Sequence, residues 1–383
     1  MDWRETSEQR QLREAVRRFV TEDPVVRRRR MREDGWIAGW DQDFSRRLGA
    51  CGWIGMTWPR RYGGQVRSPL DRLIVTEELL RAGAPVAAHW FGDRQIGPAL
   101  LAHGSEEQRR ELLPRIARGE LSFCVGMSEP DAGSDLASLR TCATITEGGF
   151  VIRGQKTWTS FADRAAYCYL VARTDPHAPR HRGVSELLVP MDAPGIRVRP
   201  IRDMVGECHF GELFFDDVQV PRHALIGNLH GGFRQIMQQL DHERSGIERL
   251  LSNAPLWEDV KRVVRDGGLA HGSPMRERIA AIEIDWQAGR GMIYRVAALL
   301  TEGRLPTHEA AAAKVFCTSL EQRIAALASE ILGPSSLLLP GDERAPLHGR
   351  AARSLLYAPA YTIQGGTNEI LREIIARRGL GLP

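Results

Sequence analysis

The chain has 383 residues, which is long enough to bury a large core and predicts two or three domains. Its 52 basic and 48 acidic residues nearly cancel, leaving a net charge of +4, so the composition does not support a nucleic-acid partner. The six cysteines lack a C-x-x-C pair or a metal-site spacing, which favours reduced thiols in a cytosolic protein without a bound metal. No signal peptide or membrane span is expected, because no apolar run reaches the roughly 18 residues that a bilayer requires.

Residues 1–120 are expected to form an N-terminal helical domain. Apolar residues recur at helical spacing, as at Leu12, Val16 and Phe19, with polar residues between them. Prolines divide this pattern into helices of ordinary length.

Residues 121–228 are expected to form a middle β domain. Short alternating or β-branched stretches, such as 143–146 and 150–152, are separated by turns. Between these two stretches lies Gly148-Gly149, which predicts a hairpin.

Residues 229–383 return to long helical patterns and are expected to form a C-terminal bundle. Short loops between long helices imply antiparallel packing. The predicted helices are 233–251, 275–301, 308–332 and 351–357.

Two neighbouring segments of the β domain form a candidate cofactor cradle. Residues 128–135 combine two helix breakers with short hydroxyl and carboxylate side chains, which predicts a tight loop with free backbone N–H groups. Residues 156–160 end a β-like stretch in which Trp158 offers a flat apolar wall. Ser128 and Ser160 can hydrogen-bond the polar edge of an isoalloxazine ring. On these residues alone, an ordinary turn is an equally good interpretation.

Six ordered motifs resemble those of the acyl-CoA dehydrogenase family, and the resemblance covers essentially the whole chain. It implies an α+β fold with an N-terminal helical domain, a middle β-barrel-like domain and a C-terminal four-helix bundle. It also implies FAD as the cofactor, held between the β domain and the C-terminal helices, since the chain has no G-x-G-x-x-G turn. The motifs occupy residues 58–64, 113–120, 124–135, 156–160, 212–221 and 364–370.

The resemblance assigns the flavin contacts to three places in the chain. Backbone groups and hydroxyls of residues 125–134 hold the ring and the pyrophosphate, with Met127 against the ring, although a plain core methionine is the alternative. Residues 158–160 complete the pocket, and two residues near the C-terminus reach the FAD from the other side. The predicted cofactor-binding residues are Val125, Met127, Ser128, Gly133, Ser134, Trp158, Thr159, Ser160, Thr367 and Glu369.

The implied reaction removes the α-proton of an acyl thioester while the β-hydrogen leaves as hydride to flavin N5. The α C–H is a very weak acid, so a carboxylate in a desolvated pocket is needed. Many family members carry it immediately before the Gly-Thr of the C-terminal motif, where this chain has Gly365. Another branch places it on the first long C-terminal helix in a Leu-Asp-x-Glu-Arg context. This chain matches that context at residues 240–244.

The resemblance therefore identifies Glu243 as the catalytic base, with an ordinary solvated helical glutamate as the alternative. The main rival is Glu248, which would face about 140° further round the helix. Near the base, Asp241 and Arg244 would anchor the pantetheine part of the substrate. The predicted substrate-binding residues are Ser134, Asp241, Arg244 and Gly366.

Two departures from the family pattern concern the surface that completes a neighbouring subunit's flavin site. Many family members have an Arg-x-x-Phe-Gly segment here, and neither residues 265–268 nor residues 273–278 reproduce it. Further along, residues 330–334 stand where a Gln and a Gly-Gly pair would be typical. The chain is therefore expected to form either a homo-oligomer, as a dimer or tetramer, or one subunit of a hetero-oligomer.

Three functions remain open from the sequence. The favoured one is FAD-dependent dehydrogenation of an acyl-CoA or acyl carrier thioester in fatty acid metabolism, with an electron-transfer flavoprotein as acceptor. The second is a flavin monooxygenase or oxidase of the same fold, against which Glu243 and Arg244 argue. The third is a non-catalytic subunit, supported by the altered interface segments.

Overall fold

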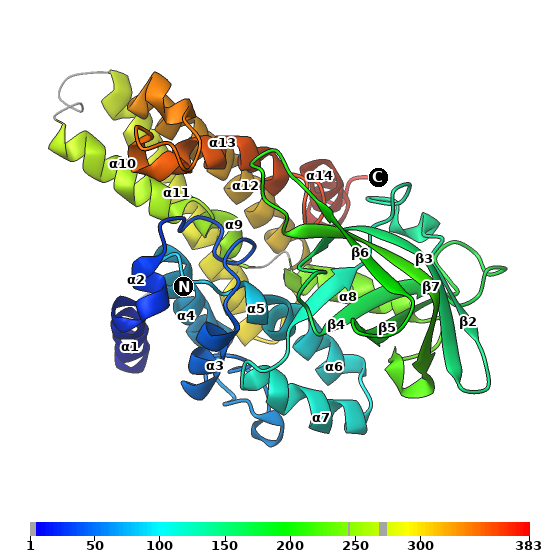
Figure 1. Ribbon diagram of the computed structural model, residues 1–383. Coiled ribbons are helices and arrows are strands. Elements are labelled where there is room, and N and C mark those ends of the chain that lie inside the picture. Colours follow the sequence, from blue (N-terminus) through cyan, green and yellow to red (C-terminus); the bar gives the residue numbers. More distant parts are fainter. Residues whose placement is uncertain (1–4, 244–245, 268–273) are drawn as a thin grey trace. The chain divides into compact units, whose positions relative to one another are not determined.

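The structure is a computed structural model that describes residues 5–243, 246–267 and 274–383, and it confirms the α+β class (Figure 1). Within α8, the side chains of Gln238 and residues 240–243 lie outside this description. The chain forms two compact units. We call Asp41–Val66 with Ala87–Glu243 the sheet unit, and Met1–Trp40 with Arg67–Val86 and Arg244–Pro383 the helical unit.

The sheet unit contains one eight-stranded sheet with the order β6-β7-β3-β2-β4-β5-β8, and β1 pairs in parallel with β4 (Figure 1). The hairpin predicted at Gly148-Gly149 is confirmed, because β2 and β3 pair antiparallel across it. The strands are β1 (Phe123–Gly126), β2 (Cys142–Ile145), β3 (Gly149–Ser160), β4 (Tyr167–Arg173), β5 (Val184–Pro190), β6 (Ile196–Ile201), β7 (Phe210–Pro221) and β8 (Leu225–Ile226). The helices of this unit include α3 (Gln42–Ala50), α5 (Ala87–Phe91), α6 (Gly97–His103), α7 (Glu106–Ala117) and α8 (Gly232–Glu243).

Two apolar clusters hold the sheet unit together. The larger one gathers inward-facing residues of β3, β4, β5 and β7, following the two-residue period of strands. The smaller one joins Ala132 of the predicted flavin loop, and Leu136 and Leu139 just after it, to β4, β5 and Ile236 of α8. The flavin loop is therefore packed on the sheet and on α8 from within its own unit.

The helical unit is built around three helices that pack side by side, α11, α12 and α13 (Figure 1). The N-terminal α4 packs on α11 and on α1, so segments far apart in the chain share this core. The helices are α1 (Ser7–Glu22), α2 (Pro24–Arg28), α4 (Pro69–Arg81), α9 (Glu248–Leu251), α10 (Ala254–Asp266), α11 (Pro274–Thr301), α12 (Thr307–Leu332), α13 (Arg350–Tyr361) and α14 (Asn368–Ile374). No helix in the described ranges has the length and apolarity to cross a membrane.

The predicted helices 275–301, 308–332 and 351–357 are confirmed as α11, α12 and most of α13. The single helix predicted at 233–251 is wrong, because α8 ends at Glu243, α9 begins at Glu248, and Gly246 and Ile247 between them are not helical. Glycine has a high entropic cost within a helix, so Gly246 is a natural break. The sequence analysis missed α10, which has Pro255 at its start, and the seven-residue α14, which follows a glycine pair.

Candidate active site

A β-bulge near the end of β3 sets the direction of Trp158. The pairing of β3 with β7 shifts register between Lys156 and Thr159, and Trp158 takes a positive φ of 57°. A bulge re-aims a side chain out of the strand pattern, and Trp158 is 58% exposed, with its ring edge-on to Phe210 at 5.8 Å. Positive φ is strained for a bulky side chain and is concentrated at ligand sites. The geometry therefore presents this indole outward as an apolar surface.

The flavin loop lies directly beside this bulge. The Thr157 N–H donates to the Ser128 carbonyl at 2.9 Å, so Ser128 and Trp158 are neighbours. Thr159 is fully buried, and its Oγ1 has no hydrogen-bond partner among the described residues. Val125, Met127, Ser128 and Ser160 are half-buried, while Gly133 and Ser134 are exposed.

The structure therefore brings together the predicted residues of the β domain. Met127 also packs against the apolar cluster formed with α8, so part of its side chain serves the core. At Gly133 an added Cβ would meet no atom within 4 Å, which leaves this part of the loop open.

A buried ion pair closes the flavin loop. Lys156 is fully buried and its Nζ donates to Glu129 Oε1 at 2.8 Å and to the Met127 carbonyl at 3.0 Å. The Glu129 carboxylate also accepts the N–H groups of Arg140 at 2.7 Å and Thr141 at 2.9 Å. The Glu129 carboxylate therefore ties the loop to β3 through Lys156 and to the segment that follows the loop through Arg140 and Thr141.

The charges of this pair are coupled through burial. Burial by itself would raise the pKa of Glu129, but Lys156 and the N–H donors outweigh it, so this pKa lies below its ordinary value. Burial lowers the pKa of Lys156, and Glu129 opposes that shift. A compact, fixed ammonium is thus held against the flavin loop, between Glu129 and the Met127 carbonyl.

The C-terminal motif forms a second fixed turn, in the helical unit. Gly365 and Gly366 have positive φ of 67° and 90°, and Thr367 caps α14 by accepting the Ile370 N–H at 3.3 Å. Lys314 of α12 is fully buried and donates to the Gly366 carbonyl at 2.9 Å and to Asn368 Oδ1 at 3.0 Å. Because residues with a side chain rarely adopt positive φ, the backbone at Gly365 disfavours a carboxylate there.

Two other groups at this turn face different environments. Glu369 is exposed and pairs with Arg372 at 3.6 Å. The Gln364 Nε2 is buried without a hydrogen-bond partner among the described residues. A buried donor of this kind is typical of a position that a bound group satisfies.

The predicted base and its neighbours fall at the limit of the description. The backbones of Asp241 and Glu243 belong to α8, but their side chains lie outside the described residues, as does all of Arg244. The rival Glu248 is buried in α9, with its carboxylate 3.8 Å from Arg249.

Hydrogen bonds near the N-terminus of α8 hold this helix on the sheet. Gln235 donates to Glu186 Oε2 on β5 at 2.6 Å and to the Ile226 carbonyl at 3.1 Å. Burial raises the pKa of Glu186 to about 7, although contacts with Tyr169 and Gln235 oppose the shift. A proton kept on this carboxyl suits a position where its described hydrogen-bond donor, Gln235, is neutral.

Sequence analysis missed the roles of Glu129, Lys156 and Lys314. A signal for the lysines was present, because only three of the 52 basic residues are lysines. Two of those three are fully buried, Lys156 beside the flavin loop and Lys314 beside the C-terminal turn. A lysine ammonium is a compact point donor, whereas the larger guanidinium group does not fit the same position. The scarcity of lysine singles out Lys156 and Lys314, but it does not separate them from Lys261, which is partly exposed.

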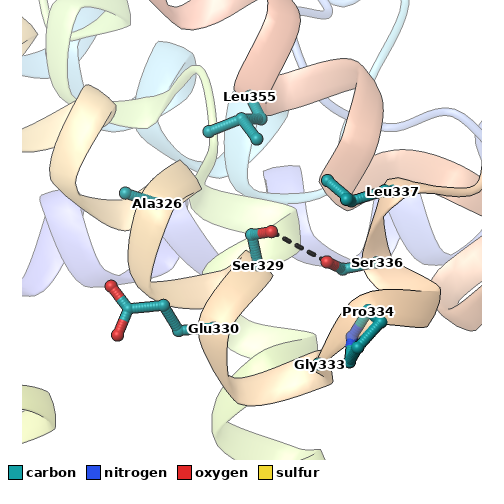
Figure 2. Close-up of a pocket in the computed structure, with 8 residues that line it drawn as sticks. All are labelled: Ala326, Ser329, Glu330, Gly333, Pro334, Ser336, Leu337 and Leu355. Carbon is teal, nitrogen blue, oxygen red and sulfur yellow. Dashed lines mark hydrogen bonds between the residues drawn. The ribbon is translucent and has the colours of Figure 1, made fainter.

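The altered interface segments contact each other in the helical unit. Arg278 of α11 pairs with Glu330 of α12, with one N···O distance of 2.8 Å. Residues 268–273 lie outside the described part of the chain. Beside Glu330 is a shallow pocket of about 390 Å³ at the end of α12, where Ser329 and Ser336 share a 2.8 Å hydrogen bond (Figure 2). Its lining residues are Ala326, Ser329, Glu330, Gly333, Pro334, Ser336, Leu337 and Leu355.

Several described residues have the chemistry that FAD requires. The sheet unit offers an outward indole, half-buried hydroxyls and a buried Thr159 Oγ1 that lacks a partner. The helical unit offers a capped helix start at Thr367 and the buried donor of Gln364. A flavin needs an apolar wall for its ring and hydrogen bonds for its polar edge, and the indole, the hydroxyls and the buried Thr159 Oγ1 of the sheet unit match both needs.

Comparison with known proteins agrees with this geometry. Family models for the N-terminal, middle and C-terminal domains of acyl-CoA dehydrogenases match residues 6–120, 124–218 and 230–380. The acyl-CoA dehydrogenase FadE26 of Mycobacterium tuberculosis is 36% identical over 352 residues, covering 88% of this chain and 86% of that protein. IpdE1 of the same organism, also an acyl-CoA dehydrogenase, is 35% identical and covers 89% and 87%.

Solved structures give the same result. The Tcur3481-Tcur3483 steroid ACAD superposes with a TM-score of 0.91 at 34% identity, over 100% of both chains. The ChsE4-ChsE5 complex from Mycobacterium tuberculosis gives a TM-score of 0.88 at 34% identity, again over 100% of both chains. This chain therefore belongs to the acyl-CoA dehydrogenase family, FAD-dependent oxidoreductases that act on CH–CH groups.

Proposed function

We propose that this chain introduces a double bond between the α and β carbons of an acyl-CoA thioester, with Glu243 as the base that removes the α-proton. The observation that carries this proposal is the turn at Gly365. It has neither the side chain nor the backbone conformation for a carboxylate, so the base must come from elsewhere. Glu243 is the last residue of α8, in the Leu-Asp-x-Glu-Arg context of the branch that keeps its base there.

FAD, when bound, supplies the acceptor for the β-hydrogen and its two electrons. The residues of this chain position and enclose that cofactor. Trp158 provides the apolar wall, and Ser128 and Ser160 lie half-buried beside it as hydrogen-bonding hydroxyls. From the sheet unit, Val125, Met127, Gly133, Ser134 and Thr159 join the cofactor set, and Thr367 and Glu369 join it from the helical unit.

The substrate contacts in this proposal lie close to the base in sequence and at the C-terminal turn. Asp241 and Arg244 flank Glu243 and would anchor the pantetheine, while Ser134 would contact the CoA moiety. The Gly366 peptide would lie against the thioester. Its carbonyl is held by Lys314, so the orientation of this turn is set before substrate binds.

Similarity to a steroid ACAD supports a bulky, polycyclic acyl group as the substrate class. A base on the helix, with glycine at the C-terminal turn, is consistent with this choice because it leaves the turn without a side chain. We further propose an electron-transfer flavoprotein as the electron acceptor.

The assembly proposed is a hetero-oligomer with a second chain of the same family. Two of the similar solved structures carry paired names, the Tcur3481-Tcur3483 steroid ACAD and the ChsE4-ChsE5 complex. In this chain, Arg278 and Glu330 of the two altered segments pair with each other. A subunit of this kind would complete its own flavin half-site fully and the neighbour's half-site weakly.

The base is tested by anaerobic titration of the purified flavoprotein with a panel of acyl-CoAs, following loss of flavin absorbance. Glu243→Gln is expected to retain FAD and lose acyl-CoA-dependent bleaching by at least about 10³-fold in rate. Glu277→Gln, an exposed glutamate at the start of α11, is the matched control and is expected to bleach normally. Normal bleaching in Glu243→Gln, or selective loss in Glu248→Gln, would reject the assignment.

Assembly is tested separately by size exclusion with flavin quantification. A single expressed chain is expected to bind clearly less than one FAD per chain, and co-expression with its partner is expected to raise that ratio. One FAD per chain in a stable homo-oligomer would refute the hetero-oligomer.

A further inference from the structure

A cluster of metal-ligating side chains lies in the loop between β6 and β7 of the sheet unit, outside the residues assigned above. Asp203, Glu207 and His209 each offer one ligand atom, and the three atoms lie within 4.8 Å of one another. His209 is buried and the two carboxylates are half-buried. The sequence analysis looked for a metal site in the cysteine spacing, which cannot reveal this cluster because its possible ligands are two carboxylates and an imidazole.

The distances within the cluster suit a shared cation better than direct hydrogen bonds. His209 Nδ1 is 3.7 Å from Asp203 Oδ2 and 3.5 Å from Glu207 Oε2. Hydrogen bonds between nitrogen and oxygen are shorter, about 2.7–3.2 Å. A tetrahedral ion with bonds of about 2.0–2.1 Å separates its ligands by about 3.3–3.4 Å. The two measured separations are close to that tetrahedral edge.

The loop also orients Asp203 as a ligand needs to be oriented. Its Oδ1 accepts the N–H groups of Val205 at 3.0 Å and Glu207 at 2.9 Å. Its Oδ2 is buried and accepts no hydrogen bond from the described residues. Gly206, with a positive φ of 84°, makes the tight turn that brings Glu207 back toward Asp203. Ligands whose second oxygen is fixed by hydrogen bonds are typical of metal sites.

We propose that Asp203, Glu207 and His209 form a binding site for a divalent transition-metal ion, with Zn²⁺ as the first choice. Two carboxylates and one imidazole match the ligand types of Zn²⁺, and three protein ligands leave a fourth position for water. The ion would lie between two carboxylates whose ligand atoms the loop holds within 4.8 Å of each other at a partly buried position.

The proposed metal site is connected to Trp158 through His209 and Phe210. The His209 carbonyl accepts the Phe161 N–H at 2.7 Å, and the His209 ring lies 4.2 Å from the ring of Phe210. Phe210 in turn contacts Trp158 edge-on and pairs with Ser160 in the β3–β7 ladder. The ion would therefore fasten the β6–β7 loop to the strand end that presents the indole. This role is structural, so it does not depend on which residue is the catalytic base.

The test uses untagged, chelator-treated full-length flavoprotein and the metals alone. Zn²⁺ is expected to raise the melting temperature by about 3 °C or more at saturation. Co²⁺ is expected to produce the visible d–d bands of a tetrahedral site, with one ion per chain. Asp203→Asn with His209→Gln should lose both responses, whereas Asp216→Asn with His223→Gln, an exposed pair in the same unit, should keep them.

The outcomes separate this proposal from other roles of the loop. Failure of Zn²⁺ and Co²⁺ to produce either response in the wild-type protein would overturn it. Equal metal responses in the Asp203/His209 variant would also overturn it, by placing the ion elsewhere. Either result leaves the Glu243 assignment untouched, because that assignment is read from flavin bleaching.

Discussion

Two buried glutamates of the sheet unit show how a partner decides the charge of an interior carboxyl. Glu129 lies in the flavin loop and meets the buried ammonium of Lys156, so its pKa falls below the ordinary value. Glu186 lies on β5 under α8 and meets the neutral donor of Gln235, so burial raises its pKa to about 7. Both carboxyls are almost inaccessible to solvent. The same residue type is therefore ionised in one region and able to hold a proton in the other.

The difference also separates two structural roles. The Glu129–Lys156 pair fixes the proposed flavin loop, and an ion pair with several N–H donors gives this loop a rigid geometry. The Glu186–Gln235 contact holds the start of a helix whose far end carries the proposed base. Removing a partner should therefore have different consequences in the two regions.

The largest effect is expected from Lys156→Met, which leaves Glu129 buried without its cation. Breaking a buried pair by removing one partner costs about 3–5 kcal/mol in the free energy of unfolding. We expect a loss of that size by denaturant titration, together with a lower FAD content. Adding Glu129→Gln should recover at least half of the loss, since the buried charge is then gone.

The matched control is Lys261→Met, because Lys261 is the third lysine and its ion pairs with Glu258 and Glu283 are partly exposed. Pairs of that kind contribute about 0–1 kcal/mol. If both variants lose the same free energy of unfolding, the Lys156–Glu129 pair contributes no more than a partly exposed ion pair, and the contrast between Glu129 and Glu186 is refuted.

A smaller effect, visible as a pH dependence, is expected at Glu186. The folded carboxyl keeps its proton up to about pH 7, whereas the unfolded one loses it near pH 4.3, so the unfolded state gains relative stability between these values. The free energy of unfolding should fall by up to about 3.7 kcal/mol as the pH rises through this window, and then level off, since each pKa unit corresponds to about 1.36 kcal/mol.

Glu186→Gln removes this titration while keeping a side chain of similar shape. Urea titrations at pH 5, 6, 7 and 8 should therefore show a flatter profile in the variant than in the wild-type protein. Parallel profiles in the two proteins would show that Glu186 titrates normally, which removes the contrast with Glu129.

The smallest effect is expected from Lys314→Met, which extends the comparison to the helical unit. Hydrogen bonds to a charged group contribute about 1.5–3 kcal/mol, and Lys314 donates to the Gly366 carbonyl and to Asn368. We expect a loss near 2 kcal/mol and faster FAD release, measured by flavin fluorescence on dilution. Unchanged FAD release would mean that the turn at residues 365–368 is held without this lysine.

Much of the fold and part of the site could be predicted from the sequence. Local periodicity predicted the long helices α11 and α12, and turn chemistry predicted the hairpin at Gly148-Gly149. The motif around Ser128 and Trp158 predicted neighbours that the structure does bring together. These features depend on residues close in the chain, so sequence alone carries the information.

The rest was decided by contacts between distant residues. Lys156 and Glu129 are 27 positions apart, and Lys314 and Asn368 are 54 positions apart. No local pattern tells a buried lysine from an exposed one, and the ionisation of Glu186 depends on which groups the fold places around it. The sequence by itself determined the family, the cofactor and the order of the elements. Only the tertiary structure decided which charges are buried together, because burial and pairing arise when separate elements pack.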